Sequence, residues 1–227
     1  MSVNPITVST LREGMPVTHI SSTLQPTTSS LILKNVWLNP RFAHSNHELA
    51  IFADRDGTLI RHADYLSDPD QVELLPGVKD TIHKLISRDI PFFILTNQSG
   101  VGRGYFPIEQ VHACQGRLFE LLEIKPEDIA GWCIAPEAPD TEDGYRKPSP
   151  RFIQEALAHL GNKDAATHMI GDTLVDLQTA WNGDSNAWAI GCGKPQLTAS
   201  HHAGEIDGSY QFCEDFSACI QSIIYAQ

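Results

Sequence analysis

The sequence has few of the features that membrane and secreted proteins need. Its apolar runs all fall short of the roughly 18 consecutive residues that a membrane-spanning helix requires. Residues 1–30 hold a single basic residue, Arg12, and no apolar core of the kind that a secretory signal carries. We therefore expect neither a membrane span nor a secretory signal.

Cysteine is also scarce, and its distribution matters more than its number. The five cysteines are an odd number and are scattered without paired spacing. A disulfide framework is therefore not expected, and we interpret these residues as buried, unreactive thiols in a cytoplasmic protein. They are Cys114, Cys133, Cys192, Cys213 and Cys219.

Positive charge is the third shortage. Sixteen Lys and Arg stand against 28 Asp and Glu, which gives a formal net charge of −12. Binding to nucleic acid or to an anionic lipid surface depends on an excess of positive charge. The balance therefore argues against both partners and favours a small-molecule ligand.

The chain has 227 residues, of which 41% are hydrophobic, enough for one substantial core or two small ones. Residues 1–30 are different, with twelve Ser or Thr and three Pro, and such a stretch buries too little surface to offset its ordering entropy. We predict a partly flexible arm over residues 1–47 and one domain over 48–227. The apolar run 31–38 is a candidate strand that docks on the domain or on a neighbouring subunit, so a monomer or a weak homodimer is expected.

From residue 48 onward, short apolar runs alternate with segments of helical periodicity. This alternation predicts an α/β fold, with a parallel sheet sandwiched by helices. Ligands of such sheets bind at the carboxyl ends of the strands. The expected strands are 49–53, 91–95, 130–135, 167–170 and 187–190, and the expected helices are 77–88, 108–123, 150–160, 174–181 and 215–226.

Charged and hydroxyl side chains stand at the ends of the predicted strands and before the helix at 150. Each residue alone has an ordinary explanation as a turn, a helix cap or a solvated loop. Together they predict a carboxylate cluster, which needs a cation, and hard oxygen ligands favour Mg²⁺. A phosphate would then bind, with one carboxylate as nucleophile and another as proton donor. These residues are Asp54, Asp56, Thr96, Lys147, Asp172 and Asp176.

The same residues carry a family resemblance, which extends over about residues 48–195. The segments Asp54-x-Asp56-Gly57-Thr58, Thr96, Lys147-Pro148 and Gly171-Asp172-x-x-x-Asp176 resemble the four motifs of the haloacid dehalogenase (HAD) superfamily. The longer segments 54–59, 64–65, 96–106 and 146–148 are similar to one branch of it, which holds heptose-1,7-bisphosphate phosphatases and histidinol-phosphate phosphatases.

The resemblance implies a Rossmann-like (HAD-like) fold and an aspartyl-phosphate mechanism. It makes Asp54 the nucleophile and Asp56 the general acid and base. Mg²⁺ would be held by the Asp54 carboxylate, the Asp56 main-chain carbonyl and Asp172, with support from Asp176. The resemblance assigns Thr96, Asn97 and Lys147 to the phosphoryl group, Arg146 to a second polar or phosphate group, and Ser99 and Arg103 to the substrate.

Spacing within the chain leaves no room for a separate cap domain. Residues 60–95 accommodate one helix and one strand, and residues 101–145 accommodate one helix, one strand and a loop. We therefore expect an open site whose specificity comes from the loops at 60–72 and 136–145.

One departure from the branch concerns zinc. Relatives commonly carry a zinc loop of Cys-x-His and Cys-x-Cys before the Arg-Lys-Pro segment. Here the corresponding stretches are Cys133-Ile134-Ala135 and Asp143-Gly144-Tyr145, which leave one ligand of the four that a closed tetrahedral site needs. We predict no structural zinc, and about one equivalent of tightly bound zinc would contradict this.

The sequence thus predicts a Mg²⁺-dependent phosphomonoester hydrolase that acts on a small phosphorylated metabolite, such as heptose 1,7-bisphosphate. The alternatives are a histidinol-phosphate phosphatase, a polynucleotide 3′-phosphatase and phosphoryl transfer to another alcohol. From a different class, a non-catalytic binding module is disfavoured because the nucleophile and the acid are both present.

Overall fold

A computed structural model describes residues 31–139, 141 and 144–225 of the chain. Seven strands form one sheet in the order β1-β4-β3-β2-β5-β6-β7, and all neighbours are parallel except β1 and β4. The strands are β1 (Val36–Leu38), β2 (Leu49–Ala53), β3 (Phe92–Asn97), β4 (Gly131–Ala135), β5 (Ala166–Gly171), β6 (Asn186–Ile190) and β7 (Gln211–Cys213).

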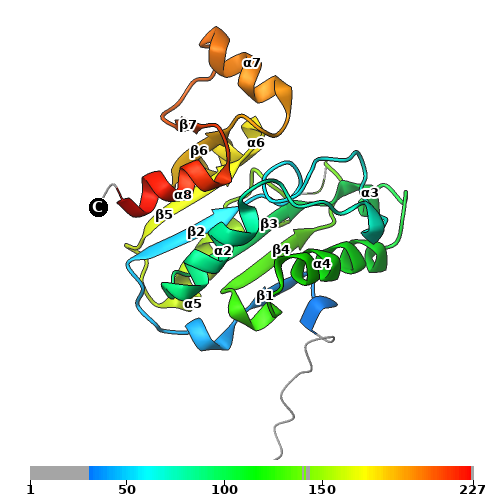
Figure 1. Cartoon of the computed structure of the whole chain (residues 1–227), viewed down its shortest axis with the longest axis horizontal. Helices are drawn as coiled ribbons and strands as arrows, with labels where there is room; N and C mark the ends of the chain where they lie inside the picture. Colours follow the sequence, from blue (N-terminus) through cyan, green and yellow to red (C-terminus); the bar gives the residue numbers. More distant parts are fainter. Residues whose placement is uncertain (1–30, 140, 142–143, 226–227) are drawn as a thin grey trace, which may run out of the picture.

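Helices cover both faces of this sheet (Figure 1). One hydrophobic core lies under α2, α4 and α8, and a second lies under α5 and α6. The α-helices are α2 (Val78–Ser87), α3 (Ser99–Gly102), α4 (Ile108–Leu122), α5 (Arg151–Leu160), α6 (Leu174–Asn182), α7 (Pro195–Ala203) and α8 (Phe216–Tyr225), and the 3₁₀ helices are η1 (Pro40–Phe42), η2 (Pro69–Gln71) and η3 (Pro126–Asp128).

The apolar composition of β2 follows from burial on both faces. Ile51 and Ala53 belong to the core under α2 and α4, whereas Ala50 and Phe52 belong to the core under α5. A strand covered on both sides has no need of polar residues at alternate positions. The predicted α/β sandwich is confirmed. Among the described residues, 60–95 hold η2, α2 and the start of β3, and 101–145 hold the end of α3, α4, η3 and β4, so neither segment contains a separate cap domain.

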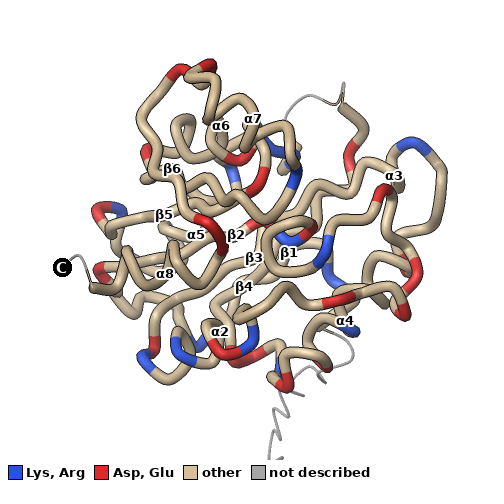
Figure 2. The backbone as a smooth tube through the Cα atoms, turned by 45° about the horizontal axis from the view of Figure 1, so that its top comes forward, with Lys and Arg blue, Asp and Glu red and all other residues tan. Residues whose placement is uncertain are grey.

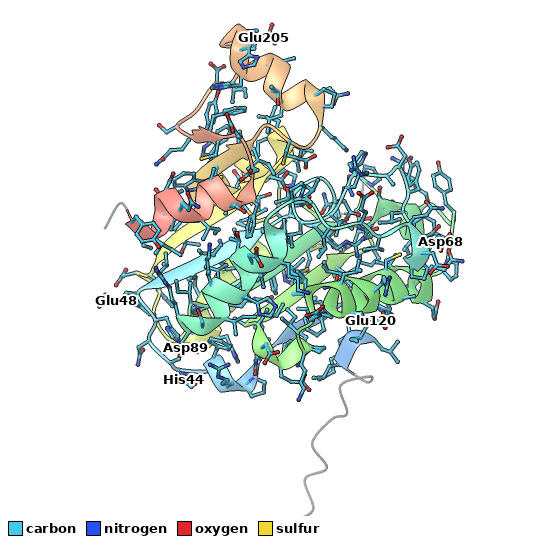
Figure 3. The ribbon with its side chains drawn as sticks, viewed as in Figure 1. His44, Glu48, Asp68, Asp89, Glu120 and Glu205 are labelled. Carbon is cyan, nitrogen blue, oxygen red and sulfur yellow. The ribbon has the colours of Figure 1, made fainter. Side chains whose placement is uncertain are left out.

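The strand order places the ligand-binding edge. β2 lies between β3 and β5, so the chain leaves β2 toward one side of the sheet and later returns on the other. Ligands of open α/β sheets bind where the order reverses, at the carboxyl ends of the strands. Glu48, labelled in Figure 3, precedes β2 at the opposite, amino-terminal edge.

The expected boundary at residue 47 is corrected by the packing of residues 31–47. β1 pairs with β4 through Trp37 and Trp132, and Leu31 and Trp37 are buried. The Asn39 amide donates to the main-chain carbonyls of Glu127 and Ile129 at 2.8 and 2.9 Å. The segment therefore docks on its own domain, with β1 as an edge strand. The remainder of the predicted arm, residues 1–30, lies outside the described residues.

Three short elements were not expected from the sequence: α3, α7 and β7. Leu197 is the buried residue of α7, so this helix lacks the repeating apolar face by which helices are recognised. β7 has three residues and lies at the edge of the sheet. In the described part of the chain, no helix has both the length and the apolar character to cross a bilayer.

Candidate active site

The carboxyl ends of β2, β3 and β5, together with the segment before α5, surround a cavity of about 520 Å³. The fold therefore brings together side chains that are distant in sequence, as expected from the predicted parallel sheet. Eight of the predicted site residues line this cavity, namely Asp54, Asp56, Thr96, Asn97, Ser99, Arg146, Lys147 and Asp172.

Three carboxylates meet at one end of the cavity. Oxygen atoms of Asp54, Asp172 and Asp176 all lie within 4.8 Å of one another, and all three residues are buried. The Lys147 ammonium donates hydrogen bonds to Asp54 and, at 2.6 Å, to Asp176. One buried cation thus faces three buried carboxylates, so the cluster carries excess negative charge.

The two oxygens of the Asp172 carboxylate differ in their hydrogen bonding. Its Oδ2 accepts a hydrogen bond from the Lys194 main-chain N–H at 2.9 Å, whereas its buried Oδ1 has no partner among the residues that the structure describes. Gly57 and Gly193 lie against this carboxylate, and a Cβ on either would collide with it. Burial, with help from the charge of Asp176, raises the Asp172 pKa to about 6. An unpartnered oxygen in a cluster of carboxylates is the environment of a hard divalent cation.

Burial is the largest single influence on the pKa of two further groups of the cluster, Asp54 and Lys147. It raises the pKa of Asp54 well above its usual value, an effect that Lys147 opposes and the other aspartates reinforce. Burial lowers the Lys147 pKa, but Asp176 and Asp54 outweigh it, and the net shift is upward. Lys147 is therefore a permanent cation beside Asp54.

The Asp56 side chain points away from the carboxylate cluster. Its Oδ2 accepts hydrogen bonds from Arg55 Nε at 3.0 Å, Thr96 Oγ1 at 2.9 Å and Gln98 Nε2 at 2.9 Å, and its Oδ1 accepts one from Arg55 Nη2 at 3.2 Å. Burial raises the Asp56 pKa, but the charge of Arg55 and the hydrogen bonds from Arg55 and Thr96 lower it by more. The net Asp56 pKa is therefore below its ordinary value. The arrangement separates this carboxylate from the three that meet at Lys147.

Thr96 and Asn97 make protein contacts that their expected phosphoryl-binding role did not include. The Thr96 hydroxyl donates to Asp56 and accepts from Gln98 Nε2 at 2.8 Å. The Asn97 amide pairs with the main chain of Lys147, at 2.8 Å to its N–H and 3.1 Å to its carbonyl. Both side chains therefore orient catalytic candidates.

The predicted residues for the distal part of the substrate divide into two groups. Arg146 lines the cavity, and its buried Nη1 has no hydrogen-bond partner among the described residues. Burial lowers the Arg146 pKa, and the nearby charge of Arg103 adds to this effect. Arg103 itself is exposed and does not line the cavity, whereas Ser99 does.

Several residues around the site were missed by sequence reasoning. Arg55 is fully buried beside Asp56, and its Nη1 donates to Gln115 Oε1 at 3.4 Å. Gln98 touches both Asp56 and Thr96, and Lys194 lies next to Asp172. The signal for Arg55 was its place between the two motif aspartates. Gln115 lies 60 positions away on α4 and gave no signal.

The two predicted specificity loops also differ in their placement. His62, Asp64, Tyr65 and Leu66 of the first loop line the cavity. In the second loop, Glu137 Oε1 accepts the Tyr145 N–H at 3.0 Å, which links two residues near opposite ends of the loop. Cys133 is a buried free thiol. In the described part of the chain, the cluster able to hold a metal is that of Asp54, Asp172 and Asp176, so the zinc expectation stays a prediction.

Comparisons with known proteins agree on one family. The family model for haloacid dehalogenase-like hydrolases matches residues 31–184. A D-glycero-beta-D-manno-heptose-1,7-bisphosphate 7-phosphatase of Mesorhizobium japonicum is 34% identical over 154 residues, which cover 63% of this chain and 70% of the relative. The enzyme of that name from Bordetella bronchiseptica is 27% identical over 175 residues, which cover 77% of this chain and 97% of the relative.

A solved structure is similar as well. The crystal structure of D,D-heptose 1,7-bisphosphate phosphatase from B. bronchiseptica, complexed with magnesium and phosphate, matches with a TM-score of 0.71 and 26% identity. The match covers 79% of this chain and 99% of the other. With the family model matching more than half of its residues, this chain belongs to the haloacid dehalogenase-like hydrolases.

Proposed function

We propose that the protein is a Mg²⁺-dependent phosphomonoester hydrolase that works through an aspartyl-phosphate intermediate. The observation that carries the proposal is the pairing of two different aspartates at the end of β2. Asp54 lies in the carboxylate cluster with Lys147, whereas Asp56 is held apart by Arg55, Thr96 and Gln98. Two carboxylates in different environments can take the different roles of nucleophile and proton carrier.

Asp54, Asp172 and the Asp56 main-chain carbonyl would hold Mg²⁺, with Asp176 in support. The unpartnered Oδ1 of Asp172 is the observation that fits this assignment. When bound, the cation offsets the negative charge of the cluster and of a phosphoryl group, which favours the ionised form of Asp54. The relative of known structure supports the metal, because it was solved with magnesium and phosphate.

In the first half-reaction, a carboxylate oxygen of Asp54 attacks phosphorus and the bond to the leaving oxygen breaks. Lys147, already hydrogen-bonded to Asp54, compensates negative charge on the transferring group. Asp56 gives a proton to the leaving oxygen, and the charge of the arriving phosphate favours its protonated form. The products of this step are an alcohol and phospho-Asp54.

In the second half-reaction, water replaces the alcohol at the same position. Asp56, now a carboxylate, takes a proton from that water as its oxygen attacks the phosphorus of phospho-Asp54. The bond between phosphorus and the Asp54 oxygen breaks, which releases inorganic phosphate. Thr96 and Asn97 support these steps by fixing Asp56 and Lys147.

For the substrate, we propose a sugar bisphosphate such as heptose 1,7-bisphosphate. The support is Arg146, whose side chain lines the same cavity as Asp54 and whose buried Nη1 has no hydrogen-bond partner in the described part of the chain. Guanidinium groups are well suited to phosphate oxygens. The names of the relatives point to this substrate. In Figure 2, Lys and Arg are scattered among Asp and Glu rather than gathered on one face, which disfavours a polynucleotide.

The test is a substrate panel with the Asp54→Asn variant as control. Heptose 1,7-bisphosphate, a heptose monophosphate, histidinol phosphate and a 3′-phosphorylated oligonucleotide are each incubated with Mg²⁺, and released phosphate is measured. We expect the bisphosphate to be hydrolysed best and Asp54→Asn to be inactive while still folded. Undiminished hydrolysis by Asp54→Asn would remove the mechanism, and preference for another member of the panel would replace the substrate.

A further inference from the structure

The Arg55 side chain is buried, which is unusual for an arginine. It is fully buried, although a guanidinium can never lose its charge in a protein. Removing such a group from water is costly unless its donors are satisfied. Arg55 lies between Asp54 and Asp56, which both line the cavity. A buried charge at this place calls for an explanation in terms of its partners.

Its partners hold the guanidinium in one orientation. Nε and Nη2 make two parallel hydrogen bonds to the two Asp56 oxygens, at 3.0 and 3.2 Å, and Nη1 reaches Gln115 Oε1 on α4 at 3.4 Å. The main chain is fixed too, because the Arg55 carbonyl accepts the N–H groups of Leu59 and Ile60 at 2.9 and 3.0 Å. Arg55 is therefore anchored both to its own turn and to a helix.

The two oxygens of Asp56 are left in unequal positions. Oδ2 accepts three hydrogen bonds, from Arg55, Thr96 and Gln98, whereas Oδ1 accepts one, from Arg55. The Asp56 side chain retains 16% exposure and lines the cavity, whereas its partner Arg55 is at 0%. A carboxylate oxygen has two lone-pair sites, so Oδ1 is the oxygen with room for a proton.

We propose that Arg55 is a positioning residue that fixes the Asp56 carboxylate so that Oδ1 exchanges the proton with the leaving group and with water, and that Gln115 holds Arg55 in place for this task. The inference rests on the proposed function, because it deepens the role given there to Asp56. A planar guanidinium can make two parallel bonds to a carboxylate, and an ammonium cannot. Arg55→Lys therefore keeps the charge and loses the orientation.

The test compares two kinds of leaving group. The experiment measures kcat/KM with Mg²⁺ for heptose 1,7-bisphosphate, whose leaving alkoxide needs a proton, and for p-nitrophenyl phosphate, whose leaving group departs without one. Because kcat/KM reports the first half-reaction, correct proton donation affects the first substrate alone. We expect Arg55→Lys to lower kcat/KM about 100-fold for the bisphosphate and less than about tenfold for the aryl ester.

Two further variants keep the test decisive. Gln115→Met is close in size and removes only the acceptor of Arg55 Nη1, so it should shift the ratio of the two kcat/KM values in the same direction by a smaller factor. If Arg55→Lys does not fold, the result for Gln115→Met decides the test. Arg41→Lys is the control, since the Arg41 guanidinium also donates to a carboxylate, that of Asp89, but on the exposed surface and outside both specificity loops.

The outcomes distinguish a failure of the positioning role of Arg55 from a failure of the proposed phosphatase activity. If wild type hydrolyses both esters and the variants lose them equally, or keep the wild-type ratio, the positioning role is wrong and the phosphatase proposal stands. If wild type hydrolyses neither ester, the proposed function fails and the inference fails with it. A loss confined to the alkyl ester, absent in Arg41→Lys, supports the assignment.

Discussion

The substitution Lys147→Met tests how much the buried ion cluster contributes to stability. Lys147 is the cation that faces Asp54 and Asp176, at 2.6 Å from the latter, and the two side chains of that pair are 4% and 0% exposed. Removing one partner of a buried pair leaves the other charges without compensation, which typically costs about 3–5 kcal/mol. A domain of this kind has about 5–15 kcal/mol of stability in total, so the loss is large.

The matched control is Lys79→Met. Lys79 also lies 2.6 Å from its carboxylate partner, Glu123, but these side chains are 36% and 73% exposed. The distance is equal to that of Lys147 and Asp176, but the pair is exposed, so we expect little change in this variant. Urea denaturation followed by circular dichroism, in EDTA at neutral pH, gives the free energy of unfolding of both variants. Mg²⁺ should restore part of the stability of Lys147→Met, because a cation in the cluster replaces the missing charge.

Two results would refute this reasoning. If both variants lose the same stability, burial does not govern the contribution of the pair. If Lys147→Met is as stable as wild type in EDTA, the carboxylates do not carry the charge that their geometry implies. Adding Asp176→Asn to Lys147→Met supplies a further check, since removing one uncompensated charge should recover about 0.5–3 kcal/mol.

Further predictions concern Asp172, one of the three carboxylates of the cluster. Gly57→Ala should displace Asp172 and weaken Mg²⁺ binding at least about tenfold. Gly104 shares a positive φ but has free space around it, so Gly104→Ala should leave binding unchanged. Calorimetric titration measures Mg²⁺ binding by both variants. The second prediction follows from the Asp172 pKa of about 6, raised from 3.8, because the metal-free folded state binds this proton more tightly than the unfolded state. Its contribution is present below about pH 4 and is lost as pH rises through 6, by about 3 kcal/mol in total. His168, whose pKa burial lowers to about 4, changes stability in the opposite direction with pH, so the measured quantity is the difference between wild type and Asp172→Asn in EDTA, between pH 5 and 7.5. A constant difference across that range contradicts the prediction.

The family and the central sheet were readable from the sequence because they depend on local patterns. β2 is apolar at every position since both of its faces are covered. Asp54 and Asp172 directly follow β2 and β5, and Thr96 lies near the end of β3. Parallel strands bring their carboxyl ends to one edge, so the convergence of Asp54, Thr96 and Asp172 followed from that reading. The elements missed were those with weak local signals, such as α7 with its single buried residue, Leu197.

Tertiary structure decided what each side chain does at that edge. The contact of Lys147 with Asp54 joins residues 93 positions apart, and that of Arg55 with Gln115 joins residues 60 apart. No local pattern encodes which lone pair of Asp56 is occupied, that Asn97 holds the main chain of Lys147, or that β1 pairs within its own chain. The sequence by itself determined which chemical groups reach the site, because their order along the strands is local; the folded protein alone determined which of them pair, because pairing depends on long-range packing and burial.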